Sequence, residues 1–289
     1  MRCLLFGATG FLGRNLINTW PTSDMDWVGL SRNHASAASI HPLVEWDALD
    51  AWPDLLPGVD AVVHAMAITD LGACEQDEPE AVRVNGLQPI QVADACRSLG
   101  IPFLYFSTDG IFGDQGDPVR LWTTEDRPHP VNAYGRSKVM AEQGISSLGW
   151  GQVIRCSFVG PSQGTRRGLI SFLAGSIRAG LKEVAGFGDR YFSPISTIDL
   201  CRRMKSMLST GPVGYGLHHW ASAPALTKAE FLAGVLAEVG SDLVVRVEYG
   251  APMPGGYPVP EIQSLACPDP QPLIRLLEDG AQALREELA

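Results

Sequence analysis

Hydrophobic and polar positions in the first half of the chain alternate between two patterns. Short, almost wholly apolar runs recur, as in parallel strands that are buried on both faces. Longer stretches in which apolar residues have helical spacing lie between these runs. The apolar runs cover residues 2–6, 27–30, 43–46, 61–65, 103–107 and 152–156, and the helical stretches cover 11–20, 79–99 and 133–147. This alternation predicts an α/β fold with a doubly wound parallel sheet of the Rossmann type.

The alternation weakens after the sixth apolar run. Helices are expected near 168–180, 197–208 and 227–239. Residues 250–272 are crowded with proline and are expected to be irregular. We therefore predict a dinucleotide-binding domain over residues 1–156, to which some later segments return. Residues 157–289 are predicted to form mainly a smaller, C-terminal substrate-binding lobe, with a cleft between the two parts.

Composition and charge narrow the class of protein. The chain has 289 residues and a net charge of -10, and apart from residues 201–205 it has no cluster of Lys and Arg that could bind nucleic acid. Its six cysteines show neither C-x-x-C pairs nor histidines at zinc spacing, so we expect reduced thiols and no metal site. No apolar run reaches the ~18 residues of a membrane span, and the first strand-like run leaves no room for a signal peptide. A cytoplasmic globular protein without a membrane partner is expected.

The first apolar run is followed at once by the motif GATGFLG, residues 7–13. Its glycines lie between an expected strand and an expected helix, which is the context of a dinucleotide site. Glycine permits unusual backbone angles in the turn and lets a pyrophosphate approach the amides of the helix N-terminus. The candidate cofactor-binding residues here are Gly7, Gly10, Phe11, Leu12 and Gly13, together with Ala65 at the end of the fourth run.

The residues that follow the second and third runs bear on the choice of cofactor. Sites that select NAD carry an acidic residue after the second strand, where it binds the ribose 2′-hydroxyl. This chain has Ser31 and Arg32 there. Because an arginine can pair with a 2′-phosphate, we predict NADP(H), with NAD(H) as the alternative. Asp47 is a candidate acceptor for the adenine amino group, or else the cap of a helix or turn.

Tyr134 and Lys138 are four positions apart in the helix expected over 133–147. Side chains at this spacing lie on one face of a helix. A nearby ammonium lowers the pKa of a phenol from its ordinary ~10 towards the value that an acid–base catalyst needs. We predict that Tyr134 donates a proton to a carbonyl oxygen. Lys138 is predicted to hold the nicotinamide ribose and to lower the tyrosine pKa.

Two polar residues complete the expected site. Thr108 follows the fifth apolar run, and the carboxyl ends of parallel strands border the ligand crevice of such sheets. It is predicted to hydrogen-bond the carbonyl oxygen from the side opposite Tyr134. Asn85, in the helical stretch 79–99, is a candidate for holding a proton-relay water, or else a polar helix residue that makes a local bond.

Taken together, these motifs resemble the extended short-chain dehydrogenases/reductases, and most closely the dTDP-4-dehydrorhamnose reductase family. The matching segments are GATGFLG (7–13), HAMAITDLGACEQDEPEAVRVNG (64–86), FSTDGIFG (106–113), YGRSK (134–138), IRCSFVG (154–160) and GLHHWASAPALTKAEF (216–231). The resemblance implies NAD(P)H-dependent reduction of a 4-keto group on a nucleotide-linked deoxysugar. It also implies that Thr108, Tyr134 and Lys138 form the catalytic triad.

The sugar-binding half departs from the family pattern. Gly110 stands where an aromatic residue usually follows STD, and Phe158 stands where a tryptophan is expected against the sugar. The candidate substrate-binding residues are Thr108, Asp109, Phe158 and Arg190, of which Arg190 is either a diphosphate contact or a surface residue. The expected partner is a small-molecule substrate, a nucleotide sugar or a different ketone, and a homodimer is left open.

Three other functions compete with the reductase. A 4,6-dehydratase needs a pair of acids after the threonine, but here Asp109 is followed by Gly110. An epimerase needs a second acid–base pair across the sugar, and no cysteine or acid is convincingly placed for it. A non-catalytic NADP-binding regulatory subunit would agree with the altered sugar-binding half, whereas the intact pair of Tyr134 and Lys138 argues against it.

Overall fold

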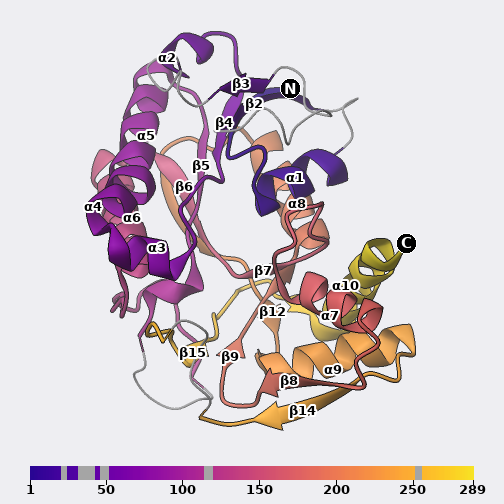
Figure 1. Cartoon of the computed structure of the whole chain (residues 1–289). Coiled ribbons are helices and arrows are strands. Elements are labelled where there is room, and N and C mark those ends of the chain that lie inside the picture. Colours follow the sequence, from indigo (N-terminus) through magenta and orange to yellow (C-terminus); the bar gives the residue numbers. More distant parts are fainter. Residues whose placement is uncertain (21–24, 32–42, 46–51, 114–119, 251–255) are drawn as a thin grey trace.

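The computed structural model describes residues 1–20, 25–31, 43–45, 52–113, 120–250 and 256–289. In this part of the chain the largest element is a seven-stranded parallel sheet in the order β11-β6-β5-β4-β1-β2-β3 (Figure 1). Its strands are β1 (Arg2–Phe6), β2 (Asp26–Ser31), β3 (Leu43–Glu45), β4 (Ala61–His64), β5 (Phe103–Phe106), β6 (Gly151–Arg155) and β11 (Tyr215–His219). The strand order reverses between β1 and β4, which is where doubly wound sheets bind their ligands. The predicted fold class is confirmed.

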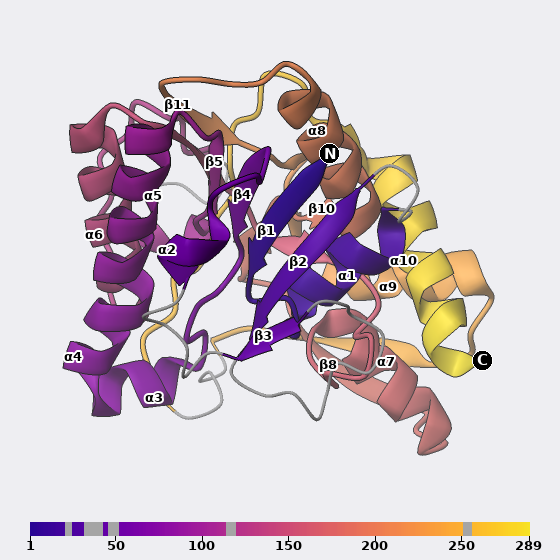
Figure 2. The same cartoon turned by 90° about the horizontal axis from the view of Figure 1, so that it is seen from above.

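Helices cover both faces of the sheet, as Figure 2 shows. They are α1 (Phe11–Thr19) and α8 (Thr197–Ser209) on one face, and α5 (Gln88–Leu99) and α6 (Ala133–Leu148) on the other. Successive strand residues point to opposite faces. Thus Leu5 packs into the apolar cluster that includes residues of α1 and α8, and Leu4 packs into the cluster that includes residues of α5 and α6. This two-sided burial explains why the strands read as continuous apolar runs.

The helix expected over 79–99 is interrupted. The structure has α4 (Glu78–Ala81), then a π-helical turn over Val82–Leu87, then α5. Such turns are rare and often occur at functional sites. The π turn places Asn85 inside the protein, where the side chain is fully buried. Two further short helices of this half are α2 (Trp52–Leu55) and α3 (Leu71–Gln76).

The remaining elements form a smaller lobe with a core of its own. Its larger elements are α7 (Leu169–Arg178), β8 (Glu183–Phe187), α9 (Lys228–Val239), β14 (Val244–Glu248) and α10 (Leu273–Leu288). Its short strands are β7 (Phe158–Val159), β9 (Tyr191–Phe192), β10 (Ile195–Ser196), β12 (Ser222–Ala223), β13 (Leu226–Thr227), β15 (Ile262–Gln263) and β16 (Gln271–Pro272). Buried residues of α7, α9 and α10 share one apolar cluster. The sequence pattern predicts no helix over the stretch that forms α10.

The chain passes between the two parts more than once. β11 returns to the large sheet and pairs with β6 in parallel, and α8 packs against α1. The second half of the sequence therefore supplies an edge strand and a covering helix to the sheet part. The exact limits of the domains, 1–156 and 157–289, stay a prediction. Of the helices in the described residues, none has the length and apolar character needed to cross a membrane.

Candidate active site

The glycine motif forms a tight turn between β1 and α1. Gly7 has a φ of +85°, and a Cβ placed on it would lie 2.9 Å from the carbonyl oxygen of Ala65. A Cβ on Gly13 would lie 2.2 Å from the carbonyl oxygen of Gly7, so no larger residue fits there without moving the turn. Gly10 precedes α1 without a side-chain cap, and the first turn of the helix contains no acidic residue. The amides of that turn have no partner within the helix, so the motif fits a cofactor pyrophosphate.

The residues predicted to select the cofactor cannot be placed in the same way. Ser31 ends β2, but its side chain is outside the described residues, as are Arg32 and Asp47. The preference for NADP(H) over NAD(H) therefore stays a prediction. Phe11 and Leu12 lie in the first turn of α1, where Leu12 is buried in the core and would meet a cofactor through its backbone. The backbone amide of Ala65 donates to the carbonyl oxygen of Phe6 at 3.0 Å.

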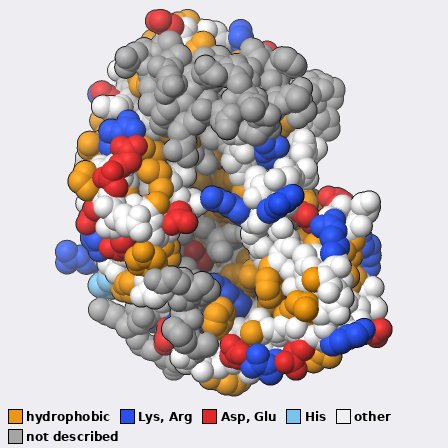
Figure 3. Space-filling view, in the orientation of Figure 1, with side chains coloured by type: hydrophobic (Ala, Val, Ile, Leu, Met, Phe, Trp, Pro, Cys, Tyr) orange, Lys and Arg blue, Asp and Glu red, His pale blue; other side chains and the backbone are white. Residues whose placement is uncertain are grey.

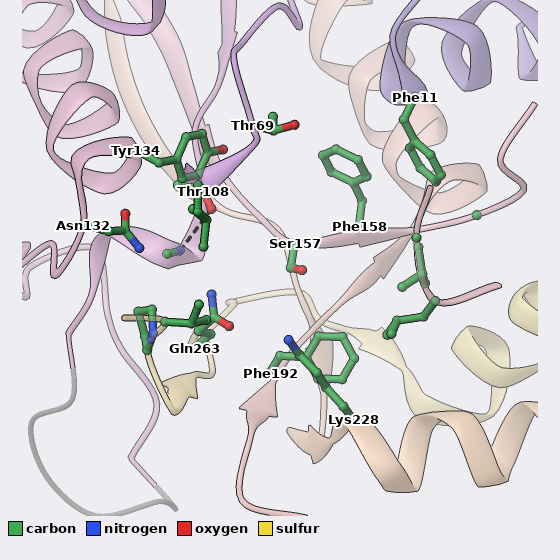
Figure 4. A pocket seen from close by; sticks show the side chains of 18 residues that line it. Phe11, Thr69, Thr108, Asn132, Tyr134, Ser157, Phe158, Phe192, Lys228 and Gln263 are labelled. Atoms are coloured by element: carbon green, nitrogen blue, oxygen red, sulfur yellow. Dashed lines mark hydrogen bonds between the residues drawn. The ribbon is translucent and has the colours of Figure 1, made fainter. Parts of the chain in front are cut away.

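A cavity of about 320 Å³ lies between the two parts of the molecule (Figures 3 and 4). It is lined by Phe11, Thr69, Leu71, Thr108, Gly110, Asn132, Tyr134, Ser157, Phe158, Val159, Gly160, Gly168, Leu169, Phe192, Lys228, Val259, Pro260 and Gln263. The structure thus brings together Thr108 and Tyr134 with Phe11 of the glycine motif. One cavity joins the predicted proton donor to the predicted cofactor loop.

The hydroxyl of Thr108 is held by its own turn. It accepts a hydrogen bond from the backbone amide of Gly110 at 3.0 Å and donates to Oδ1 of Asp109 at 3.2 Å. The same Oδ1 accepts from Nε2 of Gln263 at 3.3 Å. Burial raises the pKa of Asp109 to about 6, although the charge of Lys228 and the hydrogen bond from Thr108 act to lower it. If a substrate oxygen took the place of Asp109 as acceptor, the hydroxyl of Thr108 would donate its hydrogen bond to that oxygen.

Tyr134 lies in the first turn of α6, whose N-cap Asn132 accepts from the amide of Gly135 at 2.7 Å. Burial raises the pKa of Tyr134 above its ordinary value, although a hydrogen bond with Thr108 acts in the opposite direction. The sequence had suggested that Lys138 lowers this pKa. The difference arises because desolvation of the phenolate is the dominant effect in this buried position.

Lys138 is buried beneath the cavity rather than on its wall. Its Nζ donates to the carbonyl oxygen of Phe106 at 2.7 Å and lies 4.1 Å from the ring centre of Tyr105. Burial lowers the pKa of Lys138 to about 7, while the carboxylate of Glu142 acts to raise it. The lysine therefore titrates close to neutral pH, one helical turn from Tyr134. Its assignment as a catalytic and ribose-binding residue stays a prediction.

The side chain of Asn85 holds two segments together by hydrogen bonds. Its Oδ1 accepts from the amide of Ile68 at 2.8 Å, and its Nδ2 donates to the carbonyl oxygen of Ile68 at 2.9 Å and to Oγ of Ser137 at 3.1 Å. The side chain therefore ties the segment after β4 to α6, the helix of Tyr134. Both of its amide hydrogens are taken by these two acceptors, so the structure favours a bracing role over the water-holding role considered from sequence.

The structure places only some of the candidate substrate-binding residues on the wall of the cavity. The ring of Phe158 stacks on that of Phe11, with centroids 5.7 Å apart, so these two residues share one wall of the cavity. Arg190 is not among the described residues that line the cavity. Its Nη1 is 2.8 Å from Oε1 of Glu261 in an ion pair. A direct contact between Arg190 and a diphosphate stays a prediction.

The family model described as the RmlD substrate binding domain matches residues 1–261 of this chain. The chain belongs to this family. It is 29% identical over 258 residues to the probable low-salt glycan biosynthesis reductase Agl14 of Haloferax volcanii, covering 84% of this chain and 81% of that protein. It is 27% identical to a dTDP-4-dehydrorhamnose reductase of Mycobacterium tuberculosis, over 83% of this chain and 76% of that protein.

A solved structure gives the same fold. The dTDP-4-dehydrorhamnose reductase of Bacillus anthracis, in complex with NADP, superposes with a TM-score of 0.77 over 99% of both chains, at 18% identity. The resemblance inferred from the motifs is thus confirmed. The chain is an NAD(P)-dependent oxidoreductase of the short-chain dehydrogenase/reductase type.

Several residues that line the cavity are not among the site residues predicted from the sequence. Asn132, Ser157, Phe192, Lys228 and Gln263 all line the cavity. Phe192, Lys228 and Gln263 come from the small lobe, far along the chain from Tyr134. Lys228 lies within the matching segment 216–231 but had no role assigned to it, and all three residues reach the cavity only through the packing of the two parts. Asn132 carried the one readable signal, since an asparagine directly before a helix is a preferred N-cap.

A buried ion pair lies beside the residue that precedes Thr108. Nη2 of Arg155 is 2.7 Å from Oε2 of Glu142, and both side chains are almost fully buried. Oγ of Ser107 donates to Oε1 of the same glutamate at 2.5 Å. The pair therefore fixes the end of β6, the middle of α6 and the residue that directly precedes Thr108.

Proposed function

We propose that this chain is an NADPH-dependent reductase of a nucleotide-linked 4-keto-deoxysugar, with Tyr134 as the proton donor. The observation that carries the proposal is the shared cavity, which has Thr108 and Tyr134 on one part of its wall and Phe11 of the glycine motif on another. A carbonyl group bound there would meet two hydroxyl donors while facing the loop that fits the cofactor. This arrangement serves hydride addition to a ketone.

The cofactor, when bound, supplies the hydride that reduces the carbonyl carbon. The glycine turn and the first-turn amides of α1 would hold its pyrophosphate. Tyr134 donates its phenolic proton to the carbonyl oxygen, so that the ketone becomes a secondary alcohol. Thr108 donates a hydrogen bond to the same oxygen as negative charge develops on it. The ammonium of Lys138, one helical turn away, would offset part of the desolvation that disfavours the phenolate left on Tyr134, and solvent restores the proton for the next turnover.

The sugar substrate is supported by the relatives. The matched proteins of Haloferax volcanii and Mycobacterium tuberculosis are named as a glycan biosynthesis reductase and a dTDP-4-dehydrorhamnose reductase. The choice of NADP(H) is supported by Arg32 in the sequence and by the NADP in the Bacillus anthracis structure. The cavity, lined largely by apolar and uncharged polar side chains, suits a sugar ring with its hydroxyl groups.

The test is binding followed by turnover. Fluorescence titration with NADPH and NADH measures cofactor preference, and NADPH oxidation is then followed with dTDP-, UDP- and GDP-linked 4-ketosugars. Tyr134→Phe should still bind NADPH but lose about 10²–10⁴-fold in turnover. Tyr249→Phe is the matched control, since Tyr249 is 75% exposed and is not among the described residues that line the cavity. Tight NADPH binding without reduction of any 4-ketosugar would contradict the proposal and favour a different ketone or a non-catalytic subunit.

A further inference from the structure

Lys228 gives the cavity a positive charge that the proposed reduction does not use. Among the described residues that line the cavity, it is the only one with a charged side chain. It is the first residue of α9, directly after the N-cap Thr227. In Figure 4 its amino group points from the helix into the cavity, on the side where Gln263 lies.

None of the described residues places a counter-ion in direct contact with this ammonium. Within the described part of the chain, no carboxylate lies within 4.0 Å of Lys228, and its side chain donates no hydrogen bond. Its ring contact is with Phe192, at 6.0 Å from the centroid. Burial lowers the pKa of Lys228, and the charge of Asp109 acts to raise it. A partly buried cation without an ionic partner is costly, so a ligand that brings an anionic oxygen to it would be bound favourably.

The side chain of Gln263 relates the side of the cavity that holds this amino group to the reacting hydroxyl of Thr108. Gln263 lines the cavity and is tied through Asp109 to Thr108. A Cβ placed on Gly110 would lie 3.3 Å from Oγ1 of Thr108 and 3.6 Å from Nε2 of Gln263. The glycine therefore keeps open the room between the threonine hydroxyl and the glutamine amide, which any side chain there would enter.

We propose that Lys228, Gln263 and Gly110 form a subsite beside Thr108 for a carboxylate carried by the sugar ring of the substrate. The inference rests on the proposed function, because it assumes that the keto group is held at Thr108 and Tyr134, and it replaces the deoxysugar of that proposal with a 4-keto sugar that carries a carboxylate. A diphosphate is attached at the anomeric carbon, across the ring from a 4-keto group. Gln263 lies on the same side of the cavity as the ammonium and is tied through Asp109 to Thr108, so we assign the anion at this subsite to the ring itself. The ammonium would hold one carboxylate oxygen, and the Gln263 amide would be within the same subsite as a second donor.

The experiment uses pairs of stable ligands that differ in this carboxylate alone. Isothermal titration of the NADPH-bound protein compares UDP-glucuronic acid with UDP-glucose, and dTDP-glucuronic acid with dTDP-glucose. The acidic member of a pair should bind about 10–100-fold more tightly, as one charge-assisted contact in a partly buried site provides. Lys228→Met should abolish the difference and Lys228→Arg should retain most of it. Lys182→Met, which removes an exposed lysine outside the cavity, should leave the difference unchanged.

The other outcomes separate this inference from the proposed function. Equal binding of both members, unchanged in Lys228→Met, would overturn the subsite and leave the reductase standing. If Lys228→Met instead weakened both members and free UDP or dTDP by the same factor, the ammonium would serve the diphosphate, and the carboxylate subsite would be wrong. If no nucleotide sugar bound and no 4-ketosugar were reduced, both proposals would fall together.

Discussion

The side-chain amide of Asn132 joins the helix of Tyr134 to the small lobe. Its Nδ2 donates to the carbonyl oxygen of Pro258 at 2.9 Å, while its Oδ1 caps α6 by accepting from Gly135. The next two residues after Pro258, Val259 and Pro260, line the cavity. One asparagine thus fixes the start of the helix of Tyr134 and, through Pro258, which lies 126 residues later in the chain, the position of a cavity wall.

Replacing Asn132 should separate these two effects. Asn132→Ala loses the cap and the tether and should cost about 1–2 kcal/mol of unfolding free energy. Asn132→Ser retains a capping hydroxyl but is too short to reach Pro258, so it should be less destabilising. Hydrogen exchange of residues 256–263 should be faster in both variants. If exchange in Asn132→Ser matched the wild type, the tether would not hold this segment.

The pKa of Lys138 predicts a pH limb in the activity. With a pKa of about 7, the ammonium is present below neutral pH and is lost as the pH rises. We expect kcat/KM to fall about tenfold per pH unit on the alkaline side of this pKa. Arginine stays charged throughout this range, so Lys138→Arg should lack the limb, whatever its absolute rate. A limb that persisted unchanged in Lys138→Arg would assign the titration to another group.

Glu142 should set the position of that limb. Its carboxylate acts to raise the pKa of Lys138, so Glu142→Gln should lower this pKa and move the alkaline limb to lower pH. Glu142→Asp, which keeps the charge, should shift it less. The measurement is the same pH profile of kcat/KM. A limb that did not move in Glu142→Gln would show that the carboxylate does not act on the lysine.

The buried pair of Glu142 and Arg155 should be costly to break from either side. Glu142→Leu or Arg155→Met alone leaves one uncompensated buried charge and should lower stability by about 3–5 kcal/mol. The double variant removes both charges and should cost less than the sum of the two single changes. Urea unfolding of the four proteins measures this coupling. Additive costs would mean that the two side chains do not depend on each other.

His64 should make the fold sensitive to acid. Its ring is fully buried in β4 and stacks on Phe6 with centroids 5.1 Å apart. Burial, with the charge of Lys138, lowers the pKa of His64 from 6.5 to about 3. Between these two values the unfolded chain binds a proton that the folded chain does not, so stability falls as the pH is lowered through this window.

The size of this effect is measurable. One such histidine contributes about 1.4 kcal/mol per pH unit within its window. His64→Asn removes the titrating ring, so its unfolding free energy should depend less steeply on pH between 6 and 4. The comparison with the wild type cancels the contributions of other groups, including Asp109. Parallel slopes for the two proteins would show that His64 is not protonated on unfolding in this range.

The sequence predicted those parts of the site that depend on short-range geometry. The glycine turn needs only neighbouring residues, and Tyr134 and Lys138 share a helix face because they are four apart. Lys228 and Gln263 could not be foreseen, since they reach the cavity from separate segments of the small lobe. The pKa of Tyr134 was expected to fall, but it rises, because burial is a property of the whole fold.

The elements of the fold were likewise predictable only where the local sequence pattern decides them. Six of the seven strands of the sheet were predicted to within one or two residues because burial on both faces leaves apolar runs, whereas β11 was not among the predicted runs. The helix α10 was overlooked although Leu276 and Leu284 mark its buried side, since the proline-rich stretch before it suggested irregular structure. The π turn around Asn85 has no sequence signature that distinguishes it from an ordinary helix.

The return of β11 to the large sheet has a consequence for how the molecule can open. A cut after residue 156 would strip the sheet of β11 and expose the hydrogen-bonding edge of β6. The nucleotide-binding half is therefore not a detachable module that can be moved to another protein by a single splice. Since several segments cross between the halves, any separation of the two halves would have to move all of these crossings together.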